Sequence, residues 1–155
     1  MRIGYIVLPP DLVDRFVAVR RTMDLGPASF HQEVLADFIS EGHFVRHIRR
    51  MRVLYGERRT ALAKSIRREL GSMVEVIGDE AGMHLTVTLR NGTRDVEIAE
   101  RAARENLWIW PLSPSYIGKT PRHGFGFILG FGSTPTKGIP HAVRKLRNLL
   151  FIHRE

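Results

Sequence analysis

The chain has 155 residues, enough for one domain with a substantial core, and its 43% apolar and 26% charged residues are an ordinary globular balance. It contains no cysteine, no apolar run long enough to span a membrane and no signal-peptide pattern, so we expect a cytoplasmic protein without disulfides, cysteine-ligated zinc or thiol catalysis. The net charge of +8 permits binding to nucleic acid or to another anionic partner.

The first predicted element is an apolar strand from Met1 to Leu8, which the two following prolines end. Asp11 then opens a short amphipathic helix with Phe16 and Val19 on its apolar face. The pattern offers this strand no neighbouring strand nearby in the sequence, and an unpaired apolar strand pairs readily with another edge. We therefore expect a homodimer in which this strand pairs with a second copy of the chain, or in which the two copies exchange a segment.

The longest helical pattern runs from about residue 30 to residue 70. Ser29 suits the N-cap position, because a serine hydroxyl accepts a hydrogen bond from a free backbone N–H there. Gly42 interrupts the helical rhythm, and Gly71 ends it, as glycine commonly does after the last turn of a helix. This pattern predicts either two helices that meet near Gly42 or one long helix that bridges two subdomains.

After Gly71 the apolar period changes from helical to strand-like alternation. We expect two strands joined by a turn, then a helix, two further strands and a final helix, at residues 74–76, 84–89, 95–105, 107–112, 125–131 and 139–150. Together with the long helical region before them, these elements predict an α/β fold with a mixed or antiparallel sheet.

Two histidines, His43 and His47, stand four residues apart on a predicted helix, which places both imidazoles on one face, as a zinc site requires. The residues between them include no glutamate that could act as a general base, and the sequence pattern offers no third ligand. We therefore predict no metal site and interpret the pair as surface or interface histidines.

The segment from Arg46 to Arg68 is rich in arginine. A helix of this kind could follow the phosphates of a nucleic acid. Its charges, however, are not interleaved with aromatic side chains that would stack on bases. The favoured interpretation is a solvated helix face whose arginine stems cover apolar surface.

The stretch GFGFILGFGSTPTKG, residues 124–138, contains glycines whose spacing matches neither the dinucleotide-binding nor the phosphate-loop motif. Alternating glycine and phenylalanine instead predicts a strand that another backbone or a ligand approaches closely. The helix N-terminus near Lys137 is a weak candidate for an anion site.

Two stretches of the chain resemble a known family. RIGYIVLPPDLVDRF, residues 2–16, resembles the segment that follows the cofactor lysine in fold-type I pyridoxal-phosphate enzymes. FHQEVLADFISEGHFVRHIRRMRVLYGERRTAL, residues 30–62, is similar to the aminotransferase-like half of MocR-type regulators of the GntR family, and EAGMHLTVTL and GFILGFG follow in the expected order. The resemblance covers essentially the whole chain. It implies the C-terminal small-domain portion of that fold, an α/β unit in which a long helix packs on a small mixed or antiparallel sheet.

The resemblance implies that residues 1–29 are a remnant of the large cofactor-binding domain and that residues 30–155 form the small domain with its interdomain helix. It also implies a cofactor-binding role for Arg2, whose guanidinium fork suits the cofactor phosphate, and for Gly4 and Tyr5 of the same motif. The chain would then begin just downstream of the lysine that holds pyridoxal phosphate.

The resemblance further implies which groups lie elsewhere. In the family, the cofactor lysine, the aspartate at the pyridine nitrogen and the winged helix-turn-helix lie upstream, and Lys64, Lys119, Lys137 and Lys145 fall outside the lysine position. Ile128 stands where aminotransferases place the arginine that grips the substrate carboxylate. We therefore expect no catalytic residue in this chain, no pyridoxal phosphate bound by this chain alone, and DNA contact only through a helix-turn-helix domain outside it.

The function that the resemblance favours is that of a C-terminal piece of a cofactor-sensing effector domain in a transcription regulator, not catalytic on its own. One alternative is the small-domain part of an actual class I/II aminotransferase, so whether the parent protein is an enzyme stays open. Another is a basic nucleic-acid-binding module, suggested by the net charge of +8. No membrane partner is expected.

Overall fold

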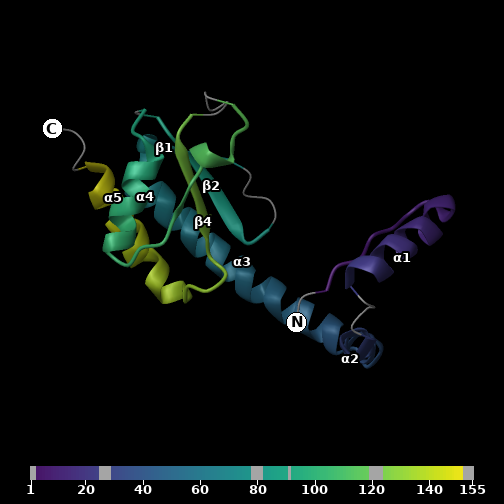
Figure 1. Ribbon diagram of the computed structural model, residues 1–155. Helices are drawn as coiled ribbons and strands as arrows, with labels where there is room; N and C mark the ends of the chain where they lie inside the picture. Colours follow the sequence, from purple (N-terminus) through teal and green to yellow (C-terminus); the bar gives the residue numbers. More distant parts are fainter. Residues whose placement is uncertain (1–2, 25–28, 78–81, 91, 119–123, 152–155) are drawn as a thin grey trace. The chain divides into compact units, whose positions relative to one another are not determined.

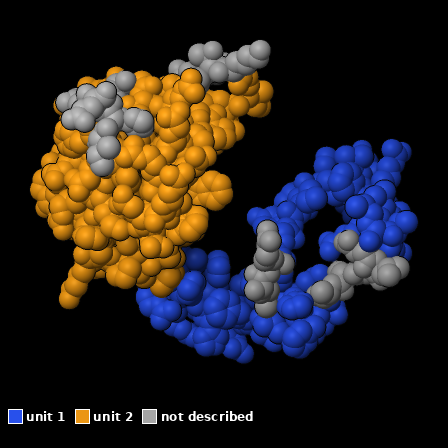
Figure 2. Space-filling view, turned by 60° about the vertical axis from the view of Figure 1, so that its left-hand side comes forward, with its two compact units in different colours: residues 1–50 blue, residues 51–155 orange. Residues whose placement is uncertain are grey.

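The computed structural model describes residues 3–24, 29–77, 82–90, 92–118 and 124–151. The chain divides into two compact units, unit 1 (residues 1–50) and unit 2 (residues 51–155), which Figure 2 colours separately. The boundary between the units falls inside helix α3 (His43–Glu69). No helix in the described part of the chain combines the length and the apolar character that crossing a bilayer requires.

Unit 1 contains an irregular N-terminal segment and two complete helices. Helix α1 (Pro10–Asp24) begins at a proline, which suits the first helical position because the missing N–H would have no partner there. Helix α2 (Ser29–Ser40) is separate from α3, and the chain turns between them at Gly42, whose φ of +74° favours glycine. The prediction of two helices that meet near Gly42 is therefore confirmed.

The strand predicted from Met1 to Leu8 is wrong over the part that the structure describes, because residues 3–8 have no regular secondary structure. A strand needs a neighbouring strand to satisfy its backbone hydrogen bonds, and none of the described strands pairs with this segment. Its side chains are left largely exposed, including Tyr5 at 89%, Ile6 at 72% and Val7 at 84%.

Unit 1 also lacks a core among its described residues, since none of them is buried. Its helices expose large apolar side chains such as Phe16, Met23 and Phe30. Helices in proteins owe most of their stability to the packing of an apolar face, and large exposed apolar surfaces mark interaction sites. The apolar faces of unit 1 are therefore available to a partner.

Unit 2 is built on a four-stranded sheet with the strand order β1-β2-β4-β3 (Figure 1). The strands are β1 (Val74–Ile77), β2 (His84–Leu89), β3 (Trp110–Pro111) and β4 (Gly126–Gly130). All three neighbouring pairs are antiparallel, which confirms the predicted small sheet and selects its antiparallel form. Strand β3 is shorter than the predicted strand at 107–112, although the Leu112 N–H still donates to the Gly126 carbonyl oxygen at 2.9 Å beyond its end.

Three helices cover one face of this sheet and form the core with it: the C-terminal half of α3, α4 (Asp95–Arg104) and α5 (Ile139–Phe151). Alternate strand residues point into this core, among them Leu85, Val87 and Phe127, each 0% exposed. Because successive side chains of a strand point to opposite faces, Thr86 and Ile128 lie on the other side, which we call the open face.

Candidate functional site

The residues with an implied cofactor role belong to the N-terminal segment of unit 1. Arg2 lies outside the described residues. Gly4 and Tyr5 line a groove of about 700 Å³ whose wall on α1 is mainly apolar and includes Phe16, with Arg20 as its charged member. The structure therefore brings Gly4 and Tyr5 together at one groove, and their role toward a cofactor stays a prediction.

This groove lacks the group that would hold pyridoxal phosphate covalently. The cofactor is bound as a Schiff base with a lysine amine, and residues 1–50 contain no lysine. The described lysines, Lys64, Lys137 and Lys145, belong to unit 2, and Lys145 Nζ donates a hydrogen bond to the Glu105 carbonyl oxygen at 2.7 Å. Residues 1–50 therefore supply no Schiff-base lysine to this groove.

The open face of the sheet in unit 2 carries a row of four side chains, one from each strand. Ile77 is paired with Thr86, Thr86 with Ile128, and Ile128 with Trp110, and residues directly opposite each other in a ladder lie on the same face. Trp110 is 73% exposed. The row contains no charged side chain, so it presents a mainly apolar surface, with the threonine hydroxyl between the two isoleucines and the indole ring at the β3 edge.

Ile128 is the central member of this row on β4. An aliphatic side chain cannot pair with a carboxylate, whereas the guanidinium fork of arginine binds one through two parallel hydrogen bonds. The position that the resemblance links to a substrate carboxylate therefore offers that group no partner in this chain.

Asp95 is a further residue of interest, and no local sequence pattern identifies it. An aspartate in the first turn of a helix is ordinarily explained by its favourable interaction with the helix dipole. In the structure its carboxylate is 0% exposed and accepts hydrogen bonds from Ser113 and from Gly126. These partners lie 18 and 31 residues further along the chain, so only the folded structure reveals the contact.

Of the two histidines of α3, His43 contacts neighbouring side chains and His47 is exposed to solvent. His43 Nε2 lies 3.0 Å from Glu41 Oε2, Arg46 donates to His43 Nδ1 at 2.8 Å, and the imidazole stacks on Phe38. His47 is exposed. Among the residues that the structure describes, no group of three or more ligating side chains is gathered around a possible metal position.

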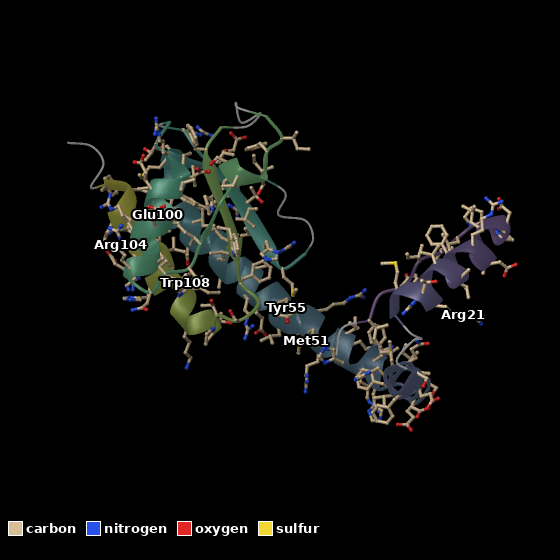
Figure 3. The ribbon with its side chains drawn as sticks, viewed as in Figure 1. Arg21, Met51, Tyr55, Glu100, Arg104 and Trp108 are labelled. Atoms are coloured by element: carbon tan, nitrogen blue, oxygen red, sulfur yellow. The ribbon has the colours of Figure 1, made fainter. Side chains whose placement is uncertain are left out.

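The arginines of α3 are partly used by the fold of unit 2. Arg58 donates to the Gly132 carbonyl oxygen and lies over the ring of Tyr55, 5.9 Å from its centroid; Tyr55 is labelled in Figure 3. Arg68 donates from Nε to Glu69 Oε1 at 3.0 Å, and Arg147 of α5 donates to Glu69 Oε2 at 2.9 Å, so this carboxylate, 9% exposed, is held by both helices. These contacts favour a structural and solvated helix face over a stripe that follows phosphates.

The glycine-rich stretch contains β4, and Gly126 at the start of this strand has no room for a side chain. A Cβ atom at this position would lie 2.0 Å from the Val87 carbonyl oxygen on β2. The prediction of a strand that another backbone approaches closely is therefore confirmed. The approaching backbone belongs to the sheet itself.

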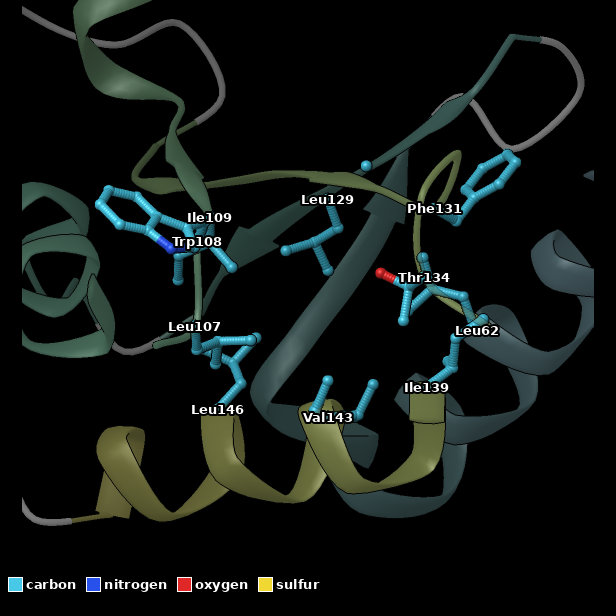
Figure 4. A pocket seen from close by; sticks show the side chains of 12 residues that line it. Leu62, Leu107, Trp108, Ile109, Leu129, Phe131, Thr134, Ile139, Val143 and Leu146 are labelled. Carbon is cyan, nitrogen blue, oxygen red and sulfur yellow. The ribbon is translucent and has the colours of Figure 1, made fainter. Parts of the chain in front are cut away.

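Unit 2 contains a small apolar cavity of about 80 Å³ between the sheet and α5 (Figure 4). Leu107, Ile109, Leu129 and Val143 are among its lining residues. Ligand sites for cofactor-sized molecules commonly measure about 300–1,000 Å³. We therefore interpret this cavity as imperfect core packing.

Comparisons with known proteins agree with this architecture. The probable rhizopine catabolism regulatory protein MocR from Rhizobium meliloti is 34% identical over 148 residues, which are 96% of this chain and 30% of the relative. The HTH-type transcriptional regulator YhdI from Bacillus subtilis is 32% identical over 95% of this chain and 31% of its own length. The 2-aminoadipate transaminase from Thermus thermophilus is 23% identical over 97% of this chain and 37% of its own length. The chain thus spans about a third of these relatives.

Solved structures share the fold. An archaeal alanine:glyoxylate aminotransferase superimposes with a TM-score of 0.87 over 98% of this chain and 37% of the other, at 21% identity. The small sheet with its helices is therefore the fold of the corresponding part of pyridoxal-phosphate-dependent aminotransferases. The family described as aminotransferase class I and II matches residues 1–124. The chain belongs to the aminotransferase class I and II family.

Proposed function

We propose that this chain is the C-terminal part of the aminotransferase-like effector domain of a MocR-type transcription regulator of the GntR family. The observation that carries the proposal is a match along nearly the whole chain to helix-turn-helix regulators, at higher identity than to the transaminase. In this proposal residues 1–29 belong to the cofactor-binding domain and residues 30–155 to the small domain. The protein is cytoplasmic and contacts DNA through a separate helix-turn-helix domain.

The role proposed for this chain is to complete a ligand site rather than to form one alone. Pyridoxal phosphate is the cofactor of the family. The motif with Arg2, Gly4 and Tyr5 would approach the cofactor phosphate, and the covalent lysine would come from the part of the domain that this chain does not contain. The absence of lysine from residues 1–50 supports this division of roles.

A segment exchange tests the proposal. The homologous third of Rhizobium meliloti MocR is replaced by these 155 residues, and covalent pyridoxal phosphate is measured by borohydride reduction and mass spectrometry. We expect the chimera to hold the cofactor on a lysine of the MocR portion and the 155-residue chain alone to hold none. A defined covalent adduct on the isolated chain, or a folded chimera that binds no cofactor, would contradict the proposal.

A second candidate, the small-domain part of a working aminotransferase, is favoured by the likeness to transaminases. A substitution at Ile128 tests which of the two proposed functions, regulator or aminotransferase, applies. If this part of the open face meets ligand carboxylates, Ile128→Arg in the chimera should tighten the binding of a simple amino acid by about tenfold, the usual value of a hydrogen-bonded ion pair. Absorbance titration of the bound cofactor measures the affinity.

The matched control is Ile77→Arg, which places the same charge on the same face at the edge strand β1. Equal effects of both substitutions would show a general charge effect and contradict the special position of Ile128. Rapid transamination by the unsubstituted chimera would favour the enzyme over the regulator.

A further inference from the structure

Helix α3 is continuous over 27 residues, but only its C-terminal part is packed into the core. A helix of this length measures about 40 Å, because each residue adds about 1.5 Å along the axis. Its buried residues are Leu62, Ala63, Ser65 and Ile66. Because helices in proteins owe most of their stability to packing, the turns that precede Leu62 are held less firmly than those that follow it.

One side of the turn before the buried residues is attached to the segment that follows β4. The Tyr55 ring meets the Phe131 ring edge-on, with 6.5 Å between the centroids, and Arg58 donates a hydrogen bond to the Gly132 carbonyl oxygen. The Arg58 guanidinium also lies over the Tyr55 ring. These two half-buried side chains hold this side of α3 to the rest of unit 2; Tyr55 is labelled in Figure 3.

The exposed side of the same turn carries Gly56, a residue type that weakens a helix. Its φ is not positive, and a Cβ atom at this position would have no neighbour within 4 Å outside the backbone of its own helix. Neither conformation nor packing therefore requires glycine here. Glycine inside a helix is less favourable than alanine, because its backbone loses more conformational freedom on folding. Gly56 thus makes this turn easier to open.

Thr60 lies one turn further along the exposed side and provides the Gly56 carbonyl oxygen with a second donor. The Thr60 hydroxyl donates a hydrogen bond to that oxygen at 2.9 Å. In an α-helix the same oxygen accepts from the Thr60 backbone N–H, so the hydroxyl keeps it hydrogen-bonded when the backbone bond lengthens. Threonine hydroxyls that bond back in this way often bend helices, and a side-chain group inserted into the backbone ladder is a usual cause of a kink.

We propose that α3 contains a hinge at Gly56 and Thr60. The helix bends there by opening its exposed side, while Tyr55 and Arg58 hold the opposite side. The bend changes the direction of the N-terminal part of α3 and leaves the buried turns from Leu62 onward in place. The inference does not rest on the proposed function, because every residue that forms the hinge belongs to unit 2.

Spin labels measure the bend, and the absence of cysteine from the chain allows them to be placed at two chosen positions. The label at His47→Cys lies on α3 about 13 Å before Gly56, and the label at Glu100→Cys lies on α4; both residues are exposed. The labelled 155-residue chain is mixed with excess unlabelled chain, so that only distances within one chain are measured. We expect a major and a minor distance, and Gly56→Ala should reduce the minor population about fivefold, the usual effect of replacing an exposed helical glycine.

Glu57→Ala is the matched control, because it introduces the same alanine at the neighbouring exposed position without removing a glycine. It should leave the minor population unchanged. A single narrow distance in the unsubstituted chain would overturn the proposal. So would a minor population that Gly56→Ala leaves unchanged, since fraying of the N-terminal part of α3 would broaden the distances without any response to Gly56.

Thr60→Val tests the hydroxyl separately from helix propensity. Valine keeps the branched shape of threonine and has nearly the same helix propensity, but it has no hydroxyl to donate. Amide hydrogen exchange, corrected for the local sequence, measures how often the turn opens. We expect protection of the residue 60 amide to rise about fivefold, because the open state loses the hydrogen bond that satisfies the Gly56 carbonyl oxygen. Unchanged or lower protection at residue 60 would refute the hinge, because helix propensity alone predicts no gain.

Discussion

Replacing Gly126 with alanine is expected to lower the free energy of unfolding of unit 2 by about 3 kcal/mol or more, at the upper end of what overpacking costs. The new Cβ atom would lie 2.0 Å from the Val87 carbonyl oxygen and 3.0 Å from the Thr88 Cα, both of which belong to the backbone of β2. Strand β2 is central and paired on both sides, so it cannot withdraw without breaking its ladders with β1 and β4. Urea unfolding followed by circular dichroism measures the loss.

Gly130→Ala on the same strand is the matched control. Its Cβ atom would lie 3.4 Å from Cδ2 of His84, an exposed side chain that can move aside. We expect a cost within about 1 kcal/mol, because surface substitutions without a named mechanism cost little. Equal losses at Gly126 and Gly130 would contradict the close approach of the two backbones as the cause.

The second large effect concerns self-association. We expect the full 155-residue chain to form a homodimer through unit 1 and a chain of residues 51–155 to be a folded monomer. The described buried apolar residues all lie between Leu62 and Leu150, so the shorter chain keeps the whole core. Unit 1 contributes none of them and exposes Tyr5, Met23 and Phe30 at 89%, 77% and 71%. Light scattering over a range of concentrations measures the mass of each chain.

Point variants locate the association surface. Met23→Ser should weaken self-association of the 155-residue chain, whereas Trp108→Ser, which removes a side chain that is 81% exposed in unit 2, should not. A monomeric 155-residue chain at high concentration, or a dimeric 51–155 chain, would refute the assignment to unit 1. The midpoint of thermal unfolding of the shorter chain should stay within about 5 °C of the value for unit 2 in the full chain, since about 1 kcal/mol corresponds to such a shift.

Local patterns predicted most of the fold of unit 2. The i, i+4 spacing of apolar residues identified α3, α4 and α5, because a helix that packs on a sheet needs one continuous apolar face. Alternation identified β1 and β2 for the equivalent reason. Glycine marked the turn at Gly42, whose positive φ is unfavourable for other residues, and the close approach at Gly126, where a Cβ atom has no room.

The parts that the sequence could not predict depend on distant partners. The apolar run over residues 3–8 has the composition of a strand, but strand formation requires pairing with a second strand, and none of the described strands pairs with this segment. Asp95 looks like an ordinary first-turn residue, because its donors at Ser113 and Gly126 are brought to it only by the sheet and α4. The implied cofactor motif was only partly placed, since Arg2 lies outside the described residues.

The unequal distribution of buried residues has an evolutionary consequence. In unit 2, an apolar residue such as Leu85 or Phe127 is preserved by the requirement to fold, whatever the protein binds. In the described part of unit 1 no side chain is buried, so a large apolar side chain that survives mutation there points to a contact made outside unit 1. The pattern of tolerated substitutions over residues 3–50 would therefore map the partner's footprint directly.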